Sequence, residues 1–195
     1  VKIHSYTLPK ILVFHNKLST EISLGNNQID GDGYLSKISP LLKDVKKVFI
    51  SEGKLGDWGM DGEIILPGID VDQYGGYTGD KRNILRVGNL IKERNLMMGF
   101  TTGEEIISDL PSITMGMNPS IKGSRLSSGF DDLLSNYRSQ RVFLNTTMEN
   151  YEDGYNLALL EAMAVGMPII SISNMTSPIK NGVNGFISNN LNYLN

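Results

Sequence analysis

The run Asp153-Gly-Tyr-Asn-Leu-Ala-Leu-Leu-Glu161-Ala-Met-Ala-Val-Gly166-Met-Pro168 decides the fold of this chain. Apolar and β-branched residues precede it at 141–146 and follow it at 168–172, which predicts a short buried strand on each side. Strong helix formers fill the positions before Gly166, where a glycine and a nearby proline end a helix. Strand, turn, helix and strand in this order predict a βαβ unit of a parallel sheet.

The turn at Asp153, Gly154 and Tyr155 is expected at a helix N-terminus, outside the carboxyl end of a strand. Ligands of open α/β sheets bind at that edge, where free N–H groups favour a phosphate or another anion, and Gly154 would let a ligand approach the backbone closely. Asp153 and Glu161 are separated by about two helical turns, a spacing that suits gripping two ends of an extended ligand through sugar hydroxyls. The alternative is that Asp153 caps the helix and Glu161 lies on a solvated face.

The same run resembles the Glu-x7-Glu segment of the retaining family 4 glycosyltransferases, which have the GT-B fold. Asp153 stands at the first acid of that pattern and Glu161 at the second, while Tyr155 replaces a phenylalanine and Asn156 the second glycine. The stretch 177–187 resembles the segment that follows in that family, although it lacks the family's glutamate.

Composition is that of an ordinary globular chain. The 195 residues are 40% apolar and 20% charged, which suffices for a real core and for one or two domains. The net charge of −3 does not indicate a nucleic-acid partner. No apolar run of about 20 residues predicts a transmembrane span. The absence of cysteine excludes disulfides and thiolate catalysis and fits a cytoplasmic location.

Glycine and proline punctuate residues 67–82, which we interpret as an interdomain linker. This segment resembles the link between the two Rossmann-like halves of the same family. Residues 1–66 are then a partial, acceptor-side lobe, and residues 83–195 are the nucleotide-sugar-binding lobe.

Local patterns predict the secondary structure of both lobes. In residues 1–66 they predict a long polar loop over 16–33, a helix over 34–43, and strands at 10–16, 47–50 and 63–66. In residues 83–195 they predict helices over 101–110 and 128–138, and strands at 83–87 and 112–115 in addition to those that flank the opening run.

A second motif of the resemblance is the turn from Gly88 to Arg94. It is similar to the family's Gly-Arg-x-x-x-x-Lys turn, in which two cations hold the donor diphosphate. Arg94 stands at the Lys position and Asn89 at the Arg position, so one cation is lost unless Lys92 compensates. An arginine can grip phosphate bidentately. The alternative is that residues 92–94 form a solvated helix start.

The resemblance implies a role for each of these residues. Glu161 would accept hydrogen bonds from the donor ribose, and Asp153 from donor-sugar hydroxyls. The diphosphate would be held by Arg94, with Gly88, Asn89 and Lys92 nearby, and by the backbone N–H groups of Gly154, Tyr155, Asn156 and Leu157. His15, which ends a predicted strand, matches a cleft histidine of the family by context, and its alternative is a capped or core histidine.

The patterns and the resemblance together imply an α/β, GT-B-like chain of two Rossmann-like lobes, the first incomplete and the second shortened. It would move a hexose-like sugar from a nucleotide-diphosphate sugar to a carbohydrate, lipid or protein acceptor, with retention of configuration. No metal or other cofactor is expected, because cations and helix N–H groups can neutralise the diphosphate. Peripheral membrane contact stays open.

Two alternatives follow from the same residues. The first is a non-catalytic nucleotide- or sugar-binding module, or a fragment of a larger GT-B enzyme. The second is a nucleotide-sugar epimerase of the same fold, for which two histidines leave little room.

Overall fold

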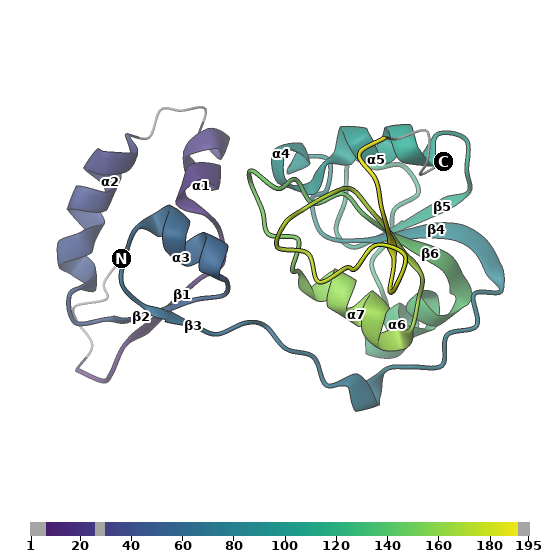
Figure 1. The fold of residues 1–195 in the computed structure, drawn as a ribbon, viewed down its shortest axis with the longest axis horizontal. Helices are drawn as coiled ribbons and strands as arrows, with labels where there is room; N and C mark the ends of the chain where they lie inside the picture. Colours follow the sequence, from purple (N-terminus) through teal and green to yellow (C-terminus); the bar gives the residue numbers. More distant parts are fainter. Residues whose placement is uncertain (1–6, 26–29, 191–195) are drawn as a thin grey trace. The chain divides into compact units, whose positions relative to one another are not determined.

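The computed structural model describes residues 7–25 and 30–190 (Figure 1). The chain divides into two compact units, Val1–Pro67 and Gly68–Asn195. None of the helices in these described ranges is both long enough and apolar enough to cross a bilayer.

The first unit is built on a three-stranded parallel sheet in the order β1 (Ile11–Phe14), β2 (Lys46–Phe49) and β3 (Glu63–Ile64). Phe14 and Phe49 are paired in register on neighbouring strands, and their rings stack with centroids 4.5 Å apart. Trp58 packs edge-on against Phe14 at 4.8 Å. This aromatic cluster is the centre of the first core.

The helices of the first unit depart from the sequence-based expectation. The observed elements are α1 (Leu18–Leu24), α2 (Gly31–Ile38), a 3-10 turn η2 (Ser39–Leu42) and α3 (Glu52–Trp58). The loop predicted over 16–33 is therefore wrong, and the helix predicted over 34–43 ends early and tightens at η2. A tertiary contact explains α1, because the Asp57 carboxylate of α3 accepts hydrogen bonds from the Ser19 N–H and hydroxyl at 2.9 and 2.7 Å. It caps α1 from another helix.

The second unit is an open, all-parallel five-stranded sheet. Its strands in spatial order are β5 (Ser112–Met115), β4 (Lys81–Val87), β6 (Gln140–Asn145), β7 (Ile169–Ser171) and β8 (Phe186–Ile187). Helices α4 (Asn95–Met98) and α5 (Phe100–Ile107) lie on one face, and α6 (Phe130–Ser139) and α7 (Leu157–Val165) lie on the other (Figure 1). The predicted βαβ unit is thus confirmed as β6, α7 and β7.

Alternating side chains of the central strands fill two cores, one on each face of this sheet. Leu85 and Phe143 point to the α6–α7 face, where they meet Leu159 of α7. Ile84 and Leu144 point to the opposite face, together with Ile106 and Ile107 of α5. The centres of the middle strands, 84–85 and 142–144, are apolar because both of their faces are packed, and this confirms the α/β class.

The segment that opens the second unit contains a short 3-10 turn, η3 (Val71–Gln73). Tyr74 and Tyr77 pack against the α6–α7 core, and the N–H groups of Thr78 and Gly79 donate to the Arg138 carbonyl at 2.9 and 3.0 Å. These contacts attach the residues just before β4 to the second unit.

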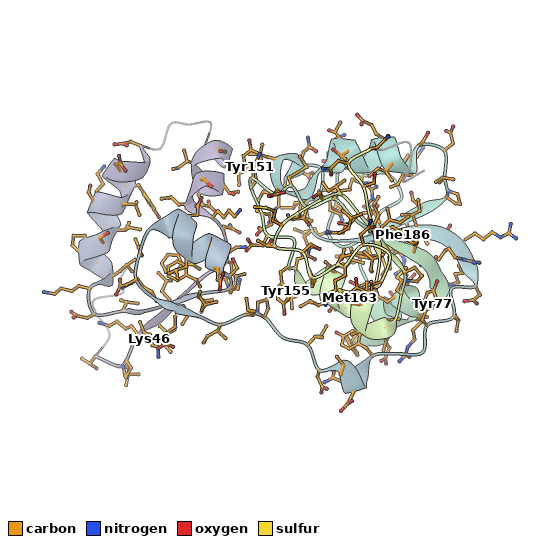
Figure 2. All side chains as sticks on the ribbon, viewed as in Figure 1. Lys46, Tyr77, Tyr151, Tyr155, Met163 and Phe186 are labelled. Atoms are coloured by element: carbon orange, nitrogen blue, oxygen red, sulfur yellow. The ribbon has the colours of Figure 1, made fainter. Side chains whose placement is uncertain are left out.

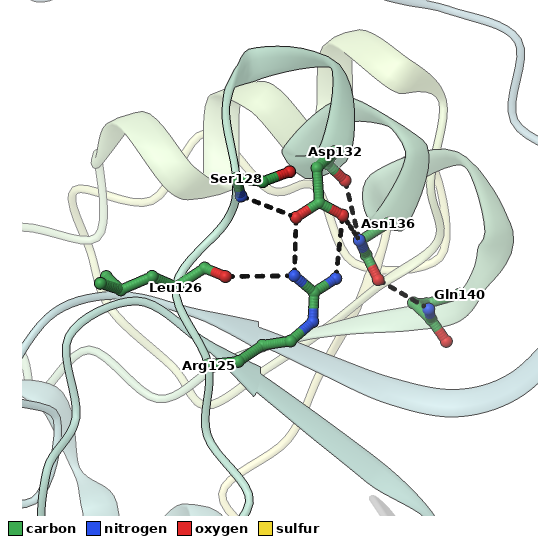
Figure 3. A network of polar contacts seen from close by, with 6 residues as sticks. All are labelled: Arg125, Leu126, Ser128, Asp132, Asn136 and Gln140. Atoms are coloured by element: carbon green, nitrogen blue, oxygen red, sulfur yellow. Dashed lines mark hydrogen bonds and ion pairs between the residues drawn. The ribbon is translucent and has the colours of Figure 1, made fainter.

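The connection between β5 and α6 is an irregular loop held by an ion-pair network (Figure 3). The Arg125 guanidinium donates to both oxygens of Asp132, at 2.6 and 2.9 Å, and Ser128 N–H donates to the same carboxylate. Hydrogen bonds from Arg125 and Ser128 hold the pKa of Asp132 well below its usual range. Asn136 of α6 and Gln140, the first residue of β6, continue the network. The loop is therefore tied to the helix that follows it.

Candidate functional site

The carboxyl ends of β4 and β5 carry two interlocked turns. Gly88 N–H donates to the Met115 carbonyl at 3.0 Å, and Leu90 N–H donates to the Met117 carbonyl at 2.8 Å. The buried Asn118 side chain accepts from Ile91 N–H and donates to the Gly88 carbonyl, both at 2.8 Å. The 88–94 turn is thus built rigidly on its neighbour, a contribution of Asn118 that the sequence reasoning missed.

The polar residues of the 88–94 turn have different environments. The Asn89 amide oxygen accepts from Met117 N–H at 2.8 Å, so this side chain holds the turn together. The exposed Lys92 places its Nζ 5.7 Å from the centroid of the Phe100 ring. Arg94 is half-buried, its nearest polar partner is the Met97 sulfur at 3.7 Å, and no carboxylate of the described residues pairs with it. Arg94 is therefore the cation of this turn that is best placed to meet an anion.

A second cation lies beneath the same strand ends. Arg86 of β4 is 5% exposed, and its Nη2 atom pairs with Glu104 of α5 at 2.8 Å while its Nε donates to the Thr114 hydroxyl at 3.2 Å. The sequence did not predict that Arg86 is buried. Arginine is rarely buried without a partner, and the partner here, Glu104, is contributed by another element.

The N-terminus of α7 lies at the same edge of the sheet, because it follows β6, the neighbour of β4. The N-cap is Asn156, whose side-chain oxygen accepts from Leu159 N–H at 3.0 Å. Its amide nitrogen lies 3.3 Å from Asn145 Oδ1 and from Thr147 Oγ1. The N–H groups of Leu157 and Ala158, at the first two helical positions, have no intrahelical acceptor. The alternative that Asp153 caps this helix is wrong.

The turn ahead of α7 is closed by contacts within the chain. Gly154 N–H donates to the Thr176 hydroxyl at 2.7 Å, and the Asn174 amide donates to the Thr147 and Glu152 carbonyls at 3.2 Å. A Cβ on Gly154 would lie 2.8 Å from Asn174 Cγ. The space beside Gly154 is thus filled by the protein, and the expectation that it admits a ligand to the backbone is wrong in this conformation.

Asp153 and Glu161 occupy different surroundings. Asp153 is 1% exposed within the closed turn, so its carboxylate is shielded from solvent in this conformation. Because α7 begins at Leu157, Asp153 lies outside the helix, and the expected separation of two helical turns between Asp153 and Glu161 is wrong. Tyr155 lies just ahead of α7, and Met163 lies near its end (Figure 2).

Glu161 is half-buried and accepts hydrogen bonds from two phenols. Tyr74 donates to Oε1 at 3.2 Å and Tyr137 to Oε2 at 2.9 Å. Burial raises the pKa of the Tyr137 hydroxyl, and the Glu161 charge raises it further. The alternative of a solvated Glu161 face is therefore wrong. Sequence reasoning missed both tyrosines, although Tyr74 lies in the segment 67–82 that had been interpreted as the linker.

His15 belongs to the first unit, where it is exposed at the end of β1. It borders a hollow of about 330 Å³ that is also lined by Phe14, Tyr34 and Trp58. The alternative of a core histidine does not hold.

These features define a Rossmann-like α/β protein whose second unit places Arg94 and the N-terminus of α7 at one edge of its sheet. The chain belongs to the family described as Glycosyl transferases group 1, which matches residues 83–193. No curated protein matches the chain.

Solved structures share the fold at low sequence identity. Anabaena Alr3699/HepE in complex with UDP and glucose is 15% identical with a TM-score of 0.66, covering 92% of this chain and 57% of that one. A mutant of S. aureus TarM in complex with fondaparinux, alpha-GlcNAc-glycerol and UDP is 15% identical with a TM-score of 0.64, covering 95% and 42%. A glycosyltransferase from Rickettsia africae is 14% identical with a TM-score of 0.60, covering 93% and 57%. The chain thus spans less than two thirds of each of these proteins.

Proposed function

We propose that this chain transfers a sugar from a nucleotide-diphosphate sugar to an acceptor hydroxyl with retention of configuration. The observation that carries the proposal is the pairing of two anion-binding features on adjacent strands. The 88–94 turn with Arg94 follows β4, and the N-terminus of α7 follows β6. Helix N–H groups and a guanidinium together suit a diphosphate.

The proposed chemistry uses these groups to carry the charge of the leaving diphosphate. The bond between the anomeric carbon and the β-phosphate oxygen breaks, and the acceptor oxygen bonds to the anomeric carbon on the same face. The proton of the acceptor hydroxyl passes to the departing β-phosphate oxygen. Arg94 and the N–H groups of Leu157 and Ala158 stabilise the nucleoside diphosphate that departs. Glu161 binds the ribose, and Asp153 meets the donor sugar once its turn has opened. The proposed reaction requires no metal ion.

UDP is the first probe for this site. HepE and TarM were solved in complex with UDP. Because this chain shares their fold, a uridine diphosphate sugar is the proposed donor. The direct test is release of UDP from UDP-sugars in the presence and absence of acceptors. Turnover supports the proposal, and failure to bind UDP or any other nucleoside diphosphate would contradict it.

A non-catalytic nucleotide-binding module is the second candidate. It is favoured by one observation, the burial of Asp153, which is 1% exposed. Binding of UDP without turnover of any nucleotide sugar by the longest native form of the protein would select it.

Glu161→Ala is expected to weaken UDP binding by about 1.5–3 kcal/mol, the range for hydrogen bonds to a charged group. Isothermal titration calorimetry measures the effect. Glu105→Ala is the matched control, because Glu105 is exposed on α5, on the other face of the sheet. Unchanged affinity in Glu161→Ala would remove the ribose role.

Arg94→Ala is expected to weaken UDP binding by about 1–3 kcal/mol and to leave uridine binding unchanged, because a guanidinium contacts the phosphates and not the nucleoside. Arg82→Ala is the control, since Arg82 is exposed near the opposite end of β4. Equal losses for UDP and uridine would move Arg94 away from the phosphates.

A further inference from the structure

The Glu161 carboxylate is oriented by two hydroxyls from different parts of the chain. Tyr74 donates to one carboxylate oxygen at 3.2 Å and Tyr137 to the other at 2.9 Å. An ionised carboxylate has about four lone-pair positions. With one phenol on each oxygen, the carboxylate plane is set and each oxygen keeps a position for a further donor. This geometry suits two neighbouring hydroxyls of one ligand.

The two tyrosines are not equivalent donors. Tyr137 lies in the core of α6 at 1% exposure, and its hydroxyl also lies 3.1 Å from the Ala158 carbonyl. Its single proton can serve only one of these two acceptors at a time. Tyr74 has no second acceptor among the described residues, so its hydroxyl is the donor dedicated to Glu161.

Tyr74 is itself held in place. Its ring packs edge-on against Phe130, the first residue of α6, with centroids 5.7 Å apart and planes at 89°. Burial raises the pKa of the Tyr74 hydroxyl, and the nearby Glu161 carboxylate raises it further. Tyr74 therefore remains a protonated donor near neutral pH, in a fixed direction.

We infer that Tyr74 is a positioning residue for recognition of the nucleotide ribose, acting through Glu161. Tyr74 belongs to the segment that opens the second unit and leads into β4. Binding of a ribose to Glu161 would therefore also stabilise the packing of this segment on α6 and α7. The inference rests on the ribose role proposed for Glu161. The ligand class is a nucleoside diphosphate with free 2′ and 3′ hydroxyls.

Tyr77 provides a matched control on the same segment. It also packs on the α6–α7 core, but its hydroxyl donates to the Arg141 carbonyl at 2.7 Å and not to Glu161. Figure 2 labels Tyr77, which is part of the second unit. Removing either phenol oxygen deletes one hydrogen bond and keeps the ring.

The test compares UDP with 2′,3′-dideoxy-UDP on wild type, Tyr74→Phe and Tyr77→Phe. Loss of one hydrogen bond of about 0.5–1.5 kcal/mol predicts that Tyr74→Phe binds UDP roughly 2- to 12-fold more weakly. Affinity for the dideoxy analogue is expected to stay at the wild-type value, because that ligand has no hydroxyls for Glu161. Tyr77→Phe is expected to bind both ligands as wild type does.

The outcomes separate this inference from the proposed function. If wild type does not bind UDP, or binds both nucleotides equally, the ribose role of Glu161 fails and the inference fails with it. If Glu161→Ala weakens UDP binding but Tyr74→Phe does not, the inference alone is overturned. Equal losses of affinity for both nucleotides in Tyr74→Phe would show that Tyr74 acts only through packing, and this result would also overturn the inference.

Discussion

Gly116→Ala is expected to cost several kcal/mol of stability and at least about tenfold in UDP affinity, because a β-carbon at this position strains and overpacks the site. Gly116 has φ +120°, a conformation that side chains rarely adopt. A Cβ there would collide with the Gly88 carbonyl oxygen and would lie 2.9 Å from Asn89 Oδ1. The proposed diphosphate-binding turn must therefore shift to make room.

Gly123→Ala separates the collision from the backbone strain. Gly123 also has a positive φ, +81°, but an added Cβ would meet no atom within 4 Å. This variant is expected to lose about 1–2 kcal/mol of stability for the left-handed conformation and to bind UDP normally. Thermal unfolding and calorimetric titration at low temperature measure both properties. A Gly116→Ala protein that matches Gly123→Ala in both would contradict the close approach of the two turns.

Asp153→Asn is expected to lower kcat by on the order of 100-fold, a loss typical of removing one electrostatic contact to the transition state, while UDP affinity hardly changes. The substitution keeps the size of the side chain and removes its charge. Glu161 and Arg94, which are proposed to hold the nucleotide, stay in place. A fall in kcat at constant affinity is the signature of lost transition-state stabilisation.

Two comparisons decide how this result is interpreted. Asp109→Asn is the control, since Asp109 is exposed beyond the end of α5, and it is expected to turn over as wild type does. His15→Ala tests the role near the donor that the family resemblance implies for His15, and that role predicts a similar fall in turnover. Because Asp153 is buried, the melting temperature of Asp153→Asn is measured as well. Turnover that neither Asp153→Asn nor His15→Ala changes would reject both residues as catalytic.

The sequence alone was sufficient for strands β4, β5, β6 and β7 and for helices α5, α6 and α7 of the second unit, whereas α4 and β8 were not predicted. The centres of the middle strands are apolar because both faces of the sheet are buried, so a local pattern carries the information. The end of α7 was equally local, since Gly166 has φ +87° and closes the helix as predicted. The position of the 88–94 turn follows from the strand before it. Each of these features depends on residues that are close together in the chain.

The sequence did not determine which residue caps the start of α7. Asp153 and Asn156 both belong to the types that cap helices, and the contacts of Asn174 and Thr176 close the turn around Asp153. Those partners follow α7 in the chain and meet the turn only when β7 lies beside β6. Asn156 is left as the cap, which is why the helical spacing of Asp153 and Glu161 was misjudged.

Only the tertiary structure decided the first helix and the surroundings of Glu161. Helix α1 forms where a polar loop was expected, because Asp57, 38 residues along the chain from Ser19, caps it. The sequence suggested that Glu161 either lies on a solvated helix face or binds a ribose without help from other side chains. In the structure its carboxylate accepts hydrogen bonds from Tyr137 and from Tyr74, which is 87 residues away in sequence. Hydrogen bonds of this kind depend on side-chain directions after the elements have packed, and they leave no periodic trace in the sequence.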